Sequence, residues 1–375
     1  MKQYEEVFFS VLRAALWKTP VDVPEGFNDW GKVMMLAKAQ TLTGLVGDVL
    51  LTTPEIRNTL APKFVAKLLE IPLENMGTHS VLNNTLILVV TELRKHGIDP
   101  VLLKGQGIAR YYPVPELRQC GDIDLYVGLK NYEKAYDALV PIASEIDPKS
   151  ALEVGKHFHL RVGTITIEVH RYATATSLVK LNKLLQEYAL EGLTSDLKAF
   201  DFAGTSVNTP ADNFNVFFIF YHLYRHFMSG GIGLRQFCDL ILLLHSVRNS
   251  VSHEYLQRIL NDMRLMEPWQ VFGCLMVDYL GASPEDIPFY DSKKNQKVEH
   301  VLKHIFKEGN FGKQAAFGRK RTDNYIYEKW LSFKYHIERY LSLIFVFPKL
   351  TLMELWNVLT VGLAQVFHDL THKQK

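Results

Sequence analysis

The feature that most constrains the fold of this chain is a short alternating segment near its centre. In residues 121–127, GDIDLYV, polar and apolar side chains alternate with the period typical of a β-strand that has one buried face. The apolar members are expected to pack into a core. Asp122 and Asp124 then project from the opposite face, about 6–7 Å apart along the strand. The sequence therefore predicts a strand that presents two carboxylates on one side of a sheet.

The segments on either side of this strand have the periodicity of helices. Apolar residues recur at spacings of three and four over residues 7–16 and 80–96, and again through the C-terminal part of the chain. Thr209, Pro210 and Asp212 predict the start of a long helix. Threonine is a good N-cap, proline suits the first helical position, and aspartate suits the first turn. A few strands are therefore expected inside a largely helical chain.

These patterns predict an α+β fold in which helical regions flank a small mixed sheet. The expected parts are an N-terminal helical region at residues 1–97, a mixed α/β domain at residues 98–205, and a C-terminal helical domain at residues 206–375. A length of 375 residues accommodates two or three such units, with a core that needs no covalent staple.

Composition excludes several classes of protein. The formal net charge is +2, so the chain lacks the strong basic field of dedicated nucleic-acid binders. Its three cysteines have no CxxC spacing, which argues against a disulfide framework or a structural zinc site. The N-terminal segment has acidic residues before its apolar run, unlike a signal peptide, and no apolar run reaches membrane-spanning length. We therefore expect a cytoplasmic protein that does not associate with membranes.

A third acid is expected on a neighbouring strand. Residues 157–162 and 164–170 are predicted to form antiparallel strands joined through Gly163. In the second of them, Glu168 alternates with apolar residues and shares a face with His170. An unpaired charge on a buried strand is costly, so Glu168 requires either a metal ion or a basic side chain as a partner. For His170, a supporting hydrogen bond and a direct contact with substrate are both open.

A candidate phosphate-binding turn precedes the two aspartates. The apolar run 100–103 ends in Lys104 and Gly105, just before a short helix predicted at residues 106–112. A lysine and a closely approaching backbone N–H at the start of a helix suit phosphate oxygens. A plain turn with a solvated lysine explains the same residues equally well.

Taken in order, these motifs resemble the polymerase-beta-like nucleotidyltransferase superfamily, and most closely a poorly characterised bacterial branch of nucleotidyltransferase-like proteins. The match covers roughly residues 101–171. The resemblance implies that Asp122, Asp124 and Glu168 are both the catalytic and the metal-binding residues. It also implies that nucleotide is bound by residues at positions typical of the branch: Lys104, Gly105, Arg118, His157 and His170.

The activity implied by this resemblance is magnesium-dependent nucleotidyl transfer. Two Mg²⁺ ions would be held against a nucleoside triphosphate such as ATP, and a nucleoside monophosphate would pass to a hydroxyl acceptor as pyrophosphate leaves. Glu168 could instead take the proton of the acceptor itself. A small molecule, an RNA end and a protein hydroxyl all suit such a centre as acceptor.

Two other functions remain open on the sequence. One is a catalytically degraded protein that binds a nucleotide or a partner, of the toxin–antitoxin or defence type. Gln106 supports it, because the superfamily usually has a small residue after the loop glycine. The other is a metal-dependent glycosyltransferase, which also uses an Asp-x-Asp motif, normally after a run of βα units.

Weaker similarity to the branch extends to three residues of the C-terminal helices, His222, Arg235 and Asp239. Arg235 and Asp239 are four residues apart, which favours an ion pair along one helix over a role in substrate binding. Residues 307–322 are basic and rich in glycine. A solvated connection is the preferred interpretation of this segment, with a contact to phosphate or nucleic acid as the alternative.

Overall fold

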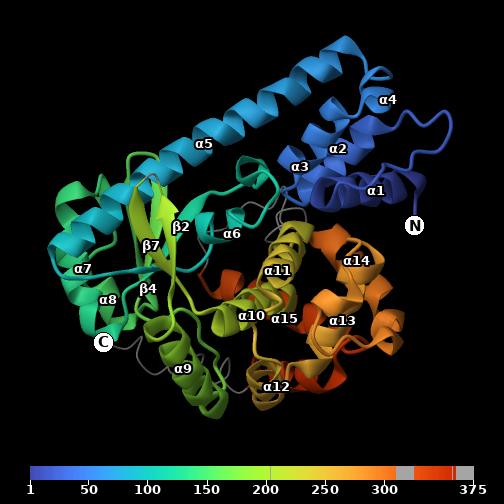
Figure 1. Cartoon of the computed structure of the whole chain (residues 1–375). Helices are drawn as coiled ribbons and strands as arrows, with labels where there is room; N and C mark the ends of the chain where they lie inside the picture. The colour runs from blue at the N-terminus through green and yellow to red at the C-terminus, as the bar shows by residue number, and fades with distance from the viewer. Residues whose placement is uncertain (203, 310–324, 357, 360–375) are drawn as a thin grey trace.

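The computed structural model describes residues 1–202, 204–309, 325–356 and 358–359, and these residues form an α+β fold as predicted (Figure 1). Helices precede the sheet and follow it. No helix among the described residues is long and apolar enough to cross a membrane. The predicted basic connection at residues 307–322 lies outside the described residues from residue 310 onward.

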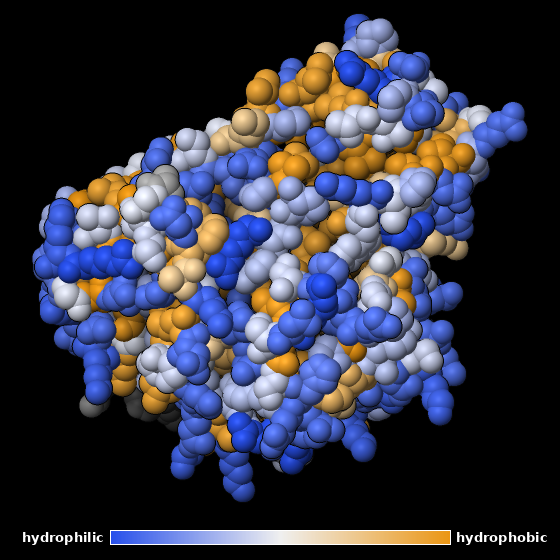
Figure 2. All heavy atoms as spheres, viewed as in Figure 1, coloured by the Kyte–Doolittle hydropathy of each residue, from blue (hydrophilic) through white to orange (hydrophobic). Residues whose placement is uncertain are grey.

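The N-terminal region is helical, as expected. Its helices are α1 (Gln3–Trp17), α2 (Trp30–Ala39), α3 (Thr43–Thr52), α4 (Pro54–Arg57) and α5 (Pro62–Lys95). Helix α5 has 34 residues and begins well before the predicted start at residue 80. Its first half exposes apolar side chains such as Leu69, Leu73 and Met76, and Figure 2 shows apolar surface over this end of the molecule. The first half of α5 therefore lacks the apolar periodicity from which the helix was predicted, and its start was placed too late.

One mixed seven-stranded sheet forms the centre of the molecule, in the order β3-β4-β5-β2-β1-β7-β6. The strands are β1 (Val101–Leu102), β2 (Asp122–Tyr126), β3 (Glu145–Ile146), β4 (His157–Val162), β5 (Ile165–His170), β6 (Lys198–Phe202) and β7 (Thr205–Thr209). The predicted hairpin through Gly163 is confirmed as β4 and β5, and Gly163 has a φ of 59°. The outer strands β3, β6 and β7 were not predicted.

The predicted N-cap at Thr209 is wrong. Thr209 is the last residue of β7, where it is paired with Lys198 of β6, and its hydroxyl donates a hydrogen bond to the Lys198 carbonyl at 3.0 Å. The long helix begins three residues later, as α10 (Asp212–Ser229), with Ala211 at its N-cap. The Thr209 hydroxyl therefore bonds within the β6–β7 hairpin and does not cap the helix. The residues around Thr209 do not reveal this pairing.

The remaining helices are α6 (Gln106–Ala109), α7 (Tyr132–Leu139), α8 (Ala151–Val154), α9 (Val179–Thr194), α11 (Leu234–Val247), α12 (His253–Asp262), α13 (Met266–Asp278), α14 (Val298–Glu308) and α15 (Tyr325–Leu343). Helix α9 packs closely against α10, because a Cβ on Gly192 would lie 2.1 Å from the Cβ of Phe214. Helix α6 is shorter than the predicted helix at residues 106–112.

Two hydrophobic cores stabilise the chain. One is formed by the apolar face of the sheet together with the second half of α5 and with α7. The other is helical and joins the N-terminal helices to the C-terminal ones, as in the contact between the rings of Phe9 and Tyr279, whose centroids are 5.0 Å apart. Helix α5 contributes to both cores and runs from the N-terminal helices to the sheet (Figure 1). The polar face of β2 and β5 is left opposite α10.

Candidate active site

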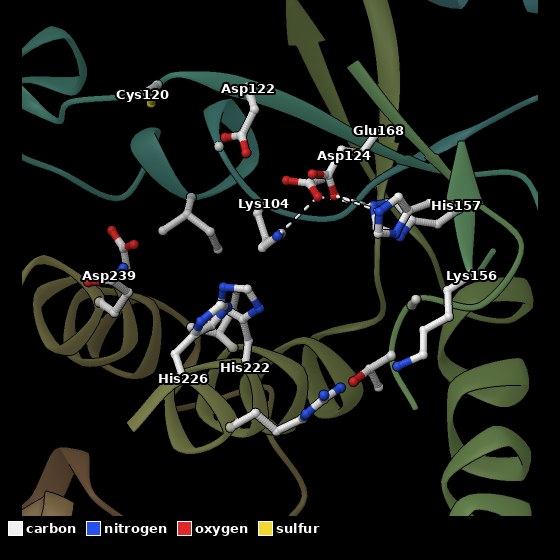
Figure 3. A pocket seen from close by; sticks show the side chains of 18 of the residues that line it. Lys104, Cys120, Asp122, Asp124, Lys156, His157, Glu168, His222, His226 and Asp239 are labelled. Atoms are coloured by element: carbon white, nitrogen blue, oxygen red, sulfur yellow. Dashed lines mark hydrogen bonds and ion pairs between the residues drawn. The ribbon is translucent and has the colours of Figure 1, made fainter. Parts of the chain in front are cut away.

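Three acids from the polar face of the sheet surround one cavity. Strands β2 and β5 are parallel neighbours, and their register places Asp124 beside Glu168 and Asp122 beside Thr166. Alternate residues of a strand share a face, so the two aspartates and Glu168 emerge on the same side. All three line a cavity of about 450 Å³, and Figure 3 shows their side chains around it. The structure thus brings together the three acids that the sequence singled out.

Asp124 is the buried member of this group. Its Oδ1 atom lies 3.0 Å from the Nζ of Lys104 and 3.0 Å from the Nε2 of His170. Burial alone would raise the pKa of Asp124, but the charge of Lys104 and the hydrogen bond from His170 outweigh burial and hold that pKa far below its usual range. The carboxylate of Asp124 is therefore ionised near neutral pH. Lys104 is not the solvated lysine of the alternative interpretation.

Asp122 lies in a different electrostatic environment, although only one residue separates it from Asp124. Its carboxylate is open to the cavity, and it forms no ion pair among the described residues. Desolvation by the cavity walls raises the pKa of Asp122, and the charge of Asp124 raises it further. A cation bound in the cavity would relieve both effects.

Glu168 is surrounded by imidazole rings from β4 and β5. Its Oε2 atom lies 3.4 Å from the Nε2 of His170 and 3.9 Å from the Nε2 of His157, and its Oε1 atom lies 3.5 Å from the Nε2 of His159. The hydrogen bond with His170 lowers the pKa of Glu168. One ligand atom each from His157, Glu168 and His170 lie within 4.8 Å of one another, a spacing that suits a metal ion. His159 was not predicted, although it alternates with His157 along the strand.

The turn after β1 places Lys104 and Gly105 against the same acids. Gly105 has a φ of 60°, a left-handed conformation that favours glycine. A Cβ at this position would also lie 3.3 Å from the backbone oxygen of Asp122. The glycine therefore lets the turn approach β2 closely, which positions the Lys104 amine beside Asp124.

Arg118 lies on the opposite side of the cavity and forms a buried ion pair with Asp239 of α11. Its Nε donates to Oδ1 at 2.7 Å and its Nη2 donates to Oδ2 at 2.8 Å, while the hydroxyl of Tyr112 donates to Oδ1 at 2.6 Å. The predicted ion pair between Arg235 and Asp239 is wrong. Asp239 is bound instead by Arg118, which donates two parallel hydrogen bonds to its carboxylate. Arg235 donates to the backbone oxygen of Gln119.

Helix α10 supplies a basic wall to the cavity that sequence reasoning largely missed. His222, Arg225 and His226 line it, together with Lys156 from the turn before β4. Burial and the charge of Lys104 place the pKa of His222 well below its ordinary value and lower that of His226 to about 4, so both rings are neutral near pH 7. The sequence does contain a signal for these three residues of α10. They are polar and lie at positions i, i+3 and i+4 of a helix rich in aromatic residues.

Comparison with known proteins identifies the family. The sequence matches the family described as uncharacterised nucleotidyltransferase over residues 27–281. The chain belongs to this nucleotidyltransferase family. Among solved structures it is similar to an antigenic nucleotidyltransferase-like protein from Paracoccidioides brasiliensis, with 14% sequence identity over 57% of this chain and 96% of that chain and a TM-score of 0.34. The curated proteins gave no significant match.

The family match covers the whole cavity. Every residue that lines the cavity lies between Lys104 and Asp239, well inside the matched range. The donor set also fits a divalent cation, because carboxylate oxygens are the hard ligands that such ions prefer, and Asp122 has no cationic partner among the described side chains. The nitrogen atoms of His157 and His170 could complete a site centred on Glu168.

Proposed function

We propose that this nucleotidyltransferase transfers a nucleoside monophosphate from a nucleoside triphosphate to a hydroxyl acceptor, with Asp122, Asp124 and Glu168 as metal ligands and pyrophosphate as the second product. One observation carries the proposal. A strand register brings the three acids to one cavity. There Asp122 forms no ion pair with a described residue, and the charges of Lys104 and Arg235 offset only part of the rise in its pKa.

The side chains of the site divide the work of such a reaction. When bound, Mg²⁺ would offset the charge of the triphosphate and acidify the acceptor hydroxyl. Lys104, 3.0 Å from Asp124, is placed to contact the triphosphate beside the turn at Gly105. Glu168 is ionised, because the hydrogen bond with His170 lowers its pKa. As an alternative to holding the metal, this carboxylate could accept the proton of the acceptor hydroxyl. His157 and His170 would orient Glu168 and are proposed to contact the nucleotide.

Arg118 has a supporting role in this proposal. The Nε and Nη2 atoms of its guanidinium donate to Asp239, and its Nη1 donates to the sulfur of Cys120 at 2.7 Å. It nevertheless lines the cavity, so it can add positive potential near the nucleotide while its position is held by the ion pair.

The test is nucleotide binding with and without the metal. A non-hydrolysable ATP analogue is titrated calorimetrically into the wild type and into Asp122→Asn, in Mg²⁺ and in a chelator. We expect the wild type to bind about 100-fold more weakly when Mg²⁺ is removed, and Asp122→Asn to bind equally weakly in both conditions. Asp137→Asn is the matched control, since Asp137 is an exposed aspartate of α7, which packs on the other face of the sheet. Metal-independent binding by the wild type would overturn the proposal.

That outcome would favour the second candidate, a nucleotide-binding protein without catalysis. The observation behind it is that Lys104 and His170 each lie 3.0 Å from Asp124, so the lysine amine could take the place of a metal ion. The glycosyltransferase interpretation has less support, because within the described sheet only β1 precedes β2 in the sequence, without the run of βα units that it requires.

A further inference from the structure

The acids of the cavity lie between two groups of basic residues. The sheet order is β4-β5-β2-β1, so the strands that carry the acids are flanked by β1 on one side and β4 on the other. Lys104 and Gly105 follow β1, whereas Lys156 immediately precedes β4. All of them line the same cavity. A nucleotidyl transfer needs two substrates at the metal centre, and this arrangement offers a separate basic group to each.

The basic group beside β4 consists of Lys156 and Arg225, which we call the β4-side cation pair. Both side chains line the cavity, Lys156 from the turn before β4 and Arg225 from α10. Neither side chain forms an ion pair with an acid among the described residues. The Nη1 of Arg225 donates to the backbone oxygen of Ala175 at 2.6 Å, which orients the guanidinium without neutralising it.

This state contrasts with that of Lys104 and Arg118. Lys104 is paired with Asp124, and Arg118 is paired with Asp239. Two cations that face one cavity without an acid partner both attract an anion placed between them. Tyr172 and Thr174, from the segment after β5, line the same cavity and carry hydroxyl groups that can add hydrogen bonds. The end of the cavity near β4 is therefore suited to an oxyanion.

We propose that the β4-side cation pair binds the phosphate group of a small phosphorylated acceptor, which makes a phosphomonoester that carries a free hydroxyl the second substrate. A dianionic phosphate matches the two positive charges, and arginine binds phosphate through parallel hydrogen bonds. The cavity volume of about 450 Å³ is in the range of small-molecule sites, roughly 300–1,000 Å³. The inference rests on the proposed function and names the class of its acceptor.

The reaction balances without a further reactant. The acceptor oxygen forms a bond to the α-phosphorus, and the bond between that phosphorus and the oxygen bridging to the β-phosphorus breaks. The hydroxyl proton passes to Glu168 or to water, and the electron pair of the broken bond leaves with pyrophosphate. The phosphate on the acceptor takes no part in the chemistry. It holds the hydroxyl in position.

The first experiment measures anion binding with inorganic phosphate as the probe. Phosphate is titrated into wild type, into Lys156→Gln/Arg225→Gln and into Lys180→Gln/Arg248→Gln. The control removes the same charges from exposed positions that do not line the cavity, and Arg248, like Arg225, donates to a backbone oxygen. We expect at least about a tenfold loss of phosphate affinity in the first variant, as for a lost charge-assisted hydrogen bond. In the control we expect little change.

The same variants are then titrated with the non-hydrolysable ATP analogue in Mg²⁺. We expect Lys156→Gln/Arg225→Gln to retain the nucleotide affinity of the wild type, because the triphosphate lies on the side of Lys104. If nucleotide affinity falls together with phosphate affinity, the pair holds the triphosphate and the inference is wrong. Unchanged phosphate binding would also overturn it. Neither result depends on the metal test with Asp122→Asn, so failure of the proposed function is recognised separately.

A labelling experiment identifies the acceptor class. A metabolite extract is divided, one half is treated with alkaline phosphatase, and the phosphatase is removed. Protein and triphosphate labelled at the α-phosphate are then added to both halves. We expect a labelled small molecule only in the untreated half. Label in both halves, or label transferred to RNA or to protein, would contradict a phosphorylated small-molecule acceptor.

Discussion

Two buried aspartates line the same cavity, and the difference between their surroundings separates a structural charge from a functional one. Asp239 receives two parallel hydrogen bonds from Arg118 and a third from Tyr112. Asp124 is contacted by Lys104 and His170, but its neighbour Asp122 has no basic partner among the described residues. The charges around Asp239 are matched within the protein. Those around Asp124 include the carboxylate of Asp122, which forms no ion pair with a described residue.

The comparison shows why burial and ion pairing alone do not identify a site. Asp239 and Asp124 are buried to a similar extent, and the pKa of each is lowered by a basic neighbour despite burial. The two aspartates differ because Asp124 has a second carboxylate beside it, that of Asp122, which forms no ion pair with a described residue. The following predictions test this distinction, in order of decreasing expected effect.

The largest loss of stability is expected when the ion pair between Arg118 and Asp239 is broken. Asp239→Asn leaves the guanidinium of Arg118 buried without its counterion, so it should lower the free energy of unfolding by about 3–5 kcal/mol. Chemical denaturation measures this change. The double variant Arg118→Met/Asp239→Leu removes both charges and should recover most of the loss. If the double variant is as unstable as the single one, Asp239 contributes through packing and the comparison fails.

The same pair makes a prediction about pH. Burial raises the pKa of Asp239, but the charge and hydrogen bonds of Arg118 lower it to a net value below the ordinary one. A carboxylate whose pKa is lowered on folding stabilises the protein above its unfolded pKa, about 4, and loses that contribution as the pH falls through its folded pKa. The difference in stability between wild type and Asp239→Asn should therefore be constant near neutrality and narrow in acid.

A smaller loss of stability is expected when Asp124 or Asp122 is replaced. Asp124→Asn removes the partner of Lys104, but the lysine amine faces the cavity and can be hydrated, so the free energy of unfolding should fall by only about 1–3 kcal/mol. Asp122→Asn should leave stability unchanged or raise it, because it removes a charge that Asp124 repels. A strongly destabilised Asp122→Asn, measured by the same denaturation, would mean that Asp122 has a structural partner.

The histidines beside Glu168 sharpen the comparison through the choice of metal. Imidazole nitrogen favours Mn²⁺ over Mg²⁺, so calorimetry should show Mn²⁺ binding about tenfold more tightly than Mg²⁺. The variant His157→Gln should reduce this preference. His245→Gln is the control, since His245 forms a comparable pair with Asp286 outside the site. Equal affinity for the two ions would leave the histidines as hydrogen-bond partners of the acids.

The smallest effect is expected at the turn that approaches β2. Gly105→Ala places a Cβ in a left-handed conformation and 3.3 Å from the backbone oxygen of Asp122, which should cost about 1–2 kcal/mol of stability. It should also weaken nucleotide binding severalfold, since the turn must move away from the acids. Gly121→Ala is the matched control, because a Cβ there meets nothing within 4 Å. Similar behaviour of the two variants would remove the turn from the site.

Much of the fold could be predicted because its signals are local. Alternation over residues 121–127 predicted β2, and the hairpin of β4 and β5 followed from two alternating runs around Gly163. Strands β3, β6 and β7 were missed, and part of their pairing depends on distant residues. Strand β7, for example, is parallel to β1, which lies about a hundred positions earlier. Thr209 was misassigned because its hydroxyl bonds to Lys198 across the β6–β7 hairpin, which was not predicted.

The sequence by itself determined which acids share a face, because alternation in a strand depends only on backbone geometry. It also determined the family, through the order of its motifs. Only the tertiary structure decided which charges are matched. Arg118 reaches Asp239 across 121 positions, and the β4-side cation pair joins a turn before β4 to a residue of α10. Ion pairs depend on distances of a few ångströms between segments far apart in the chain, and local periodicity carries no information about those distances.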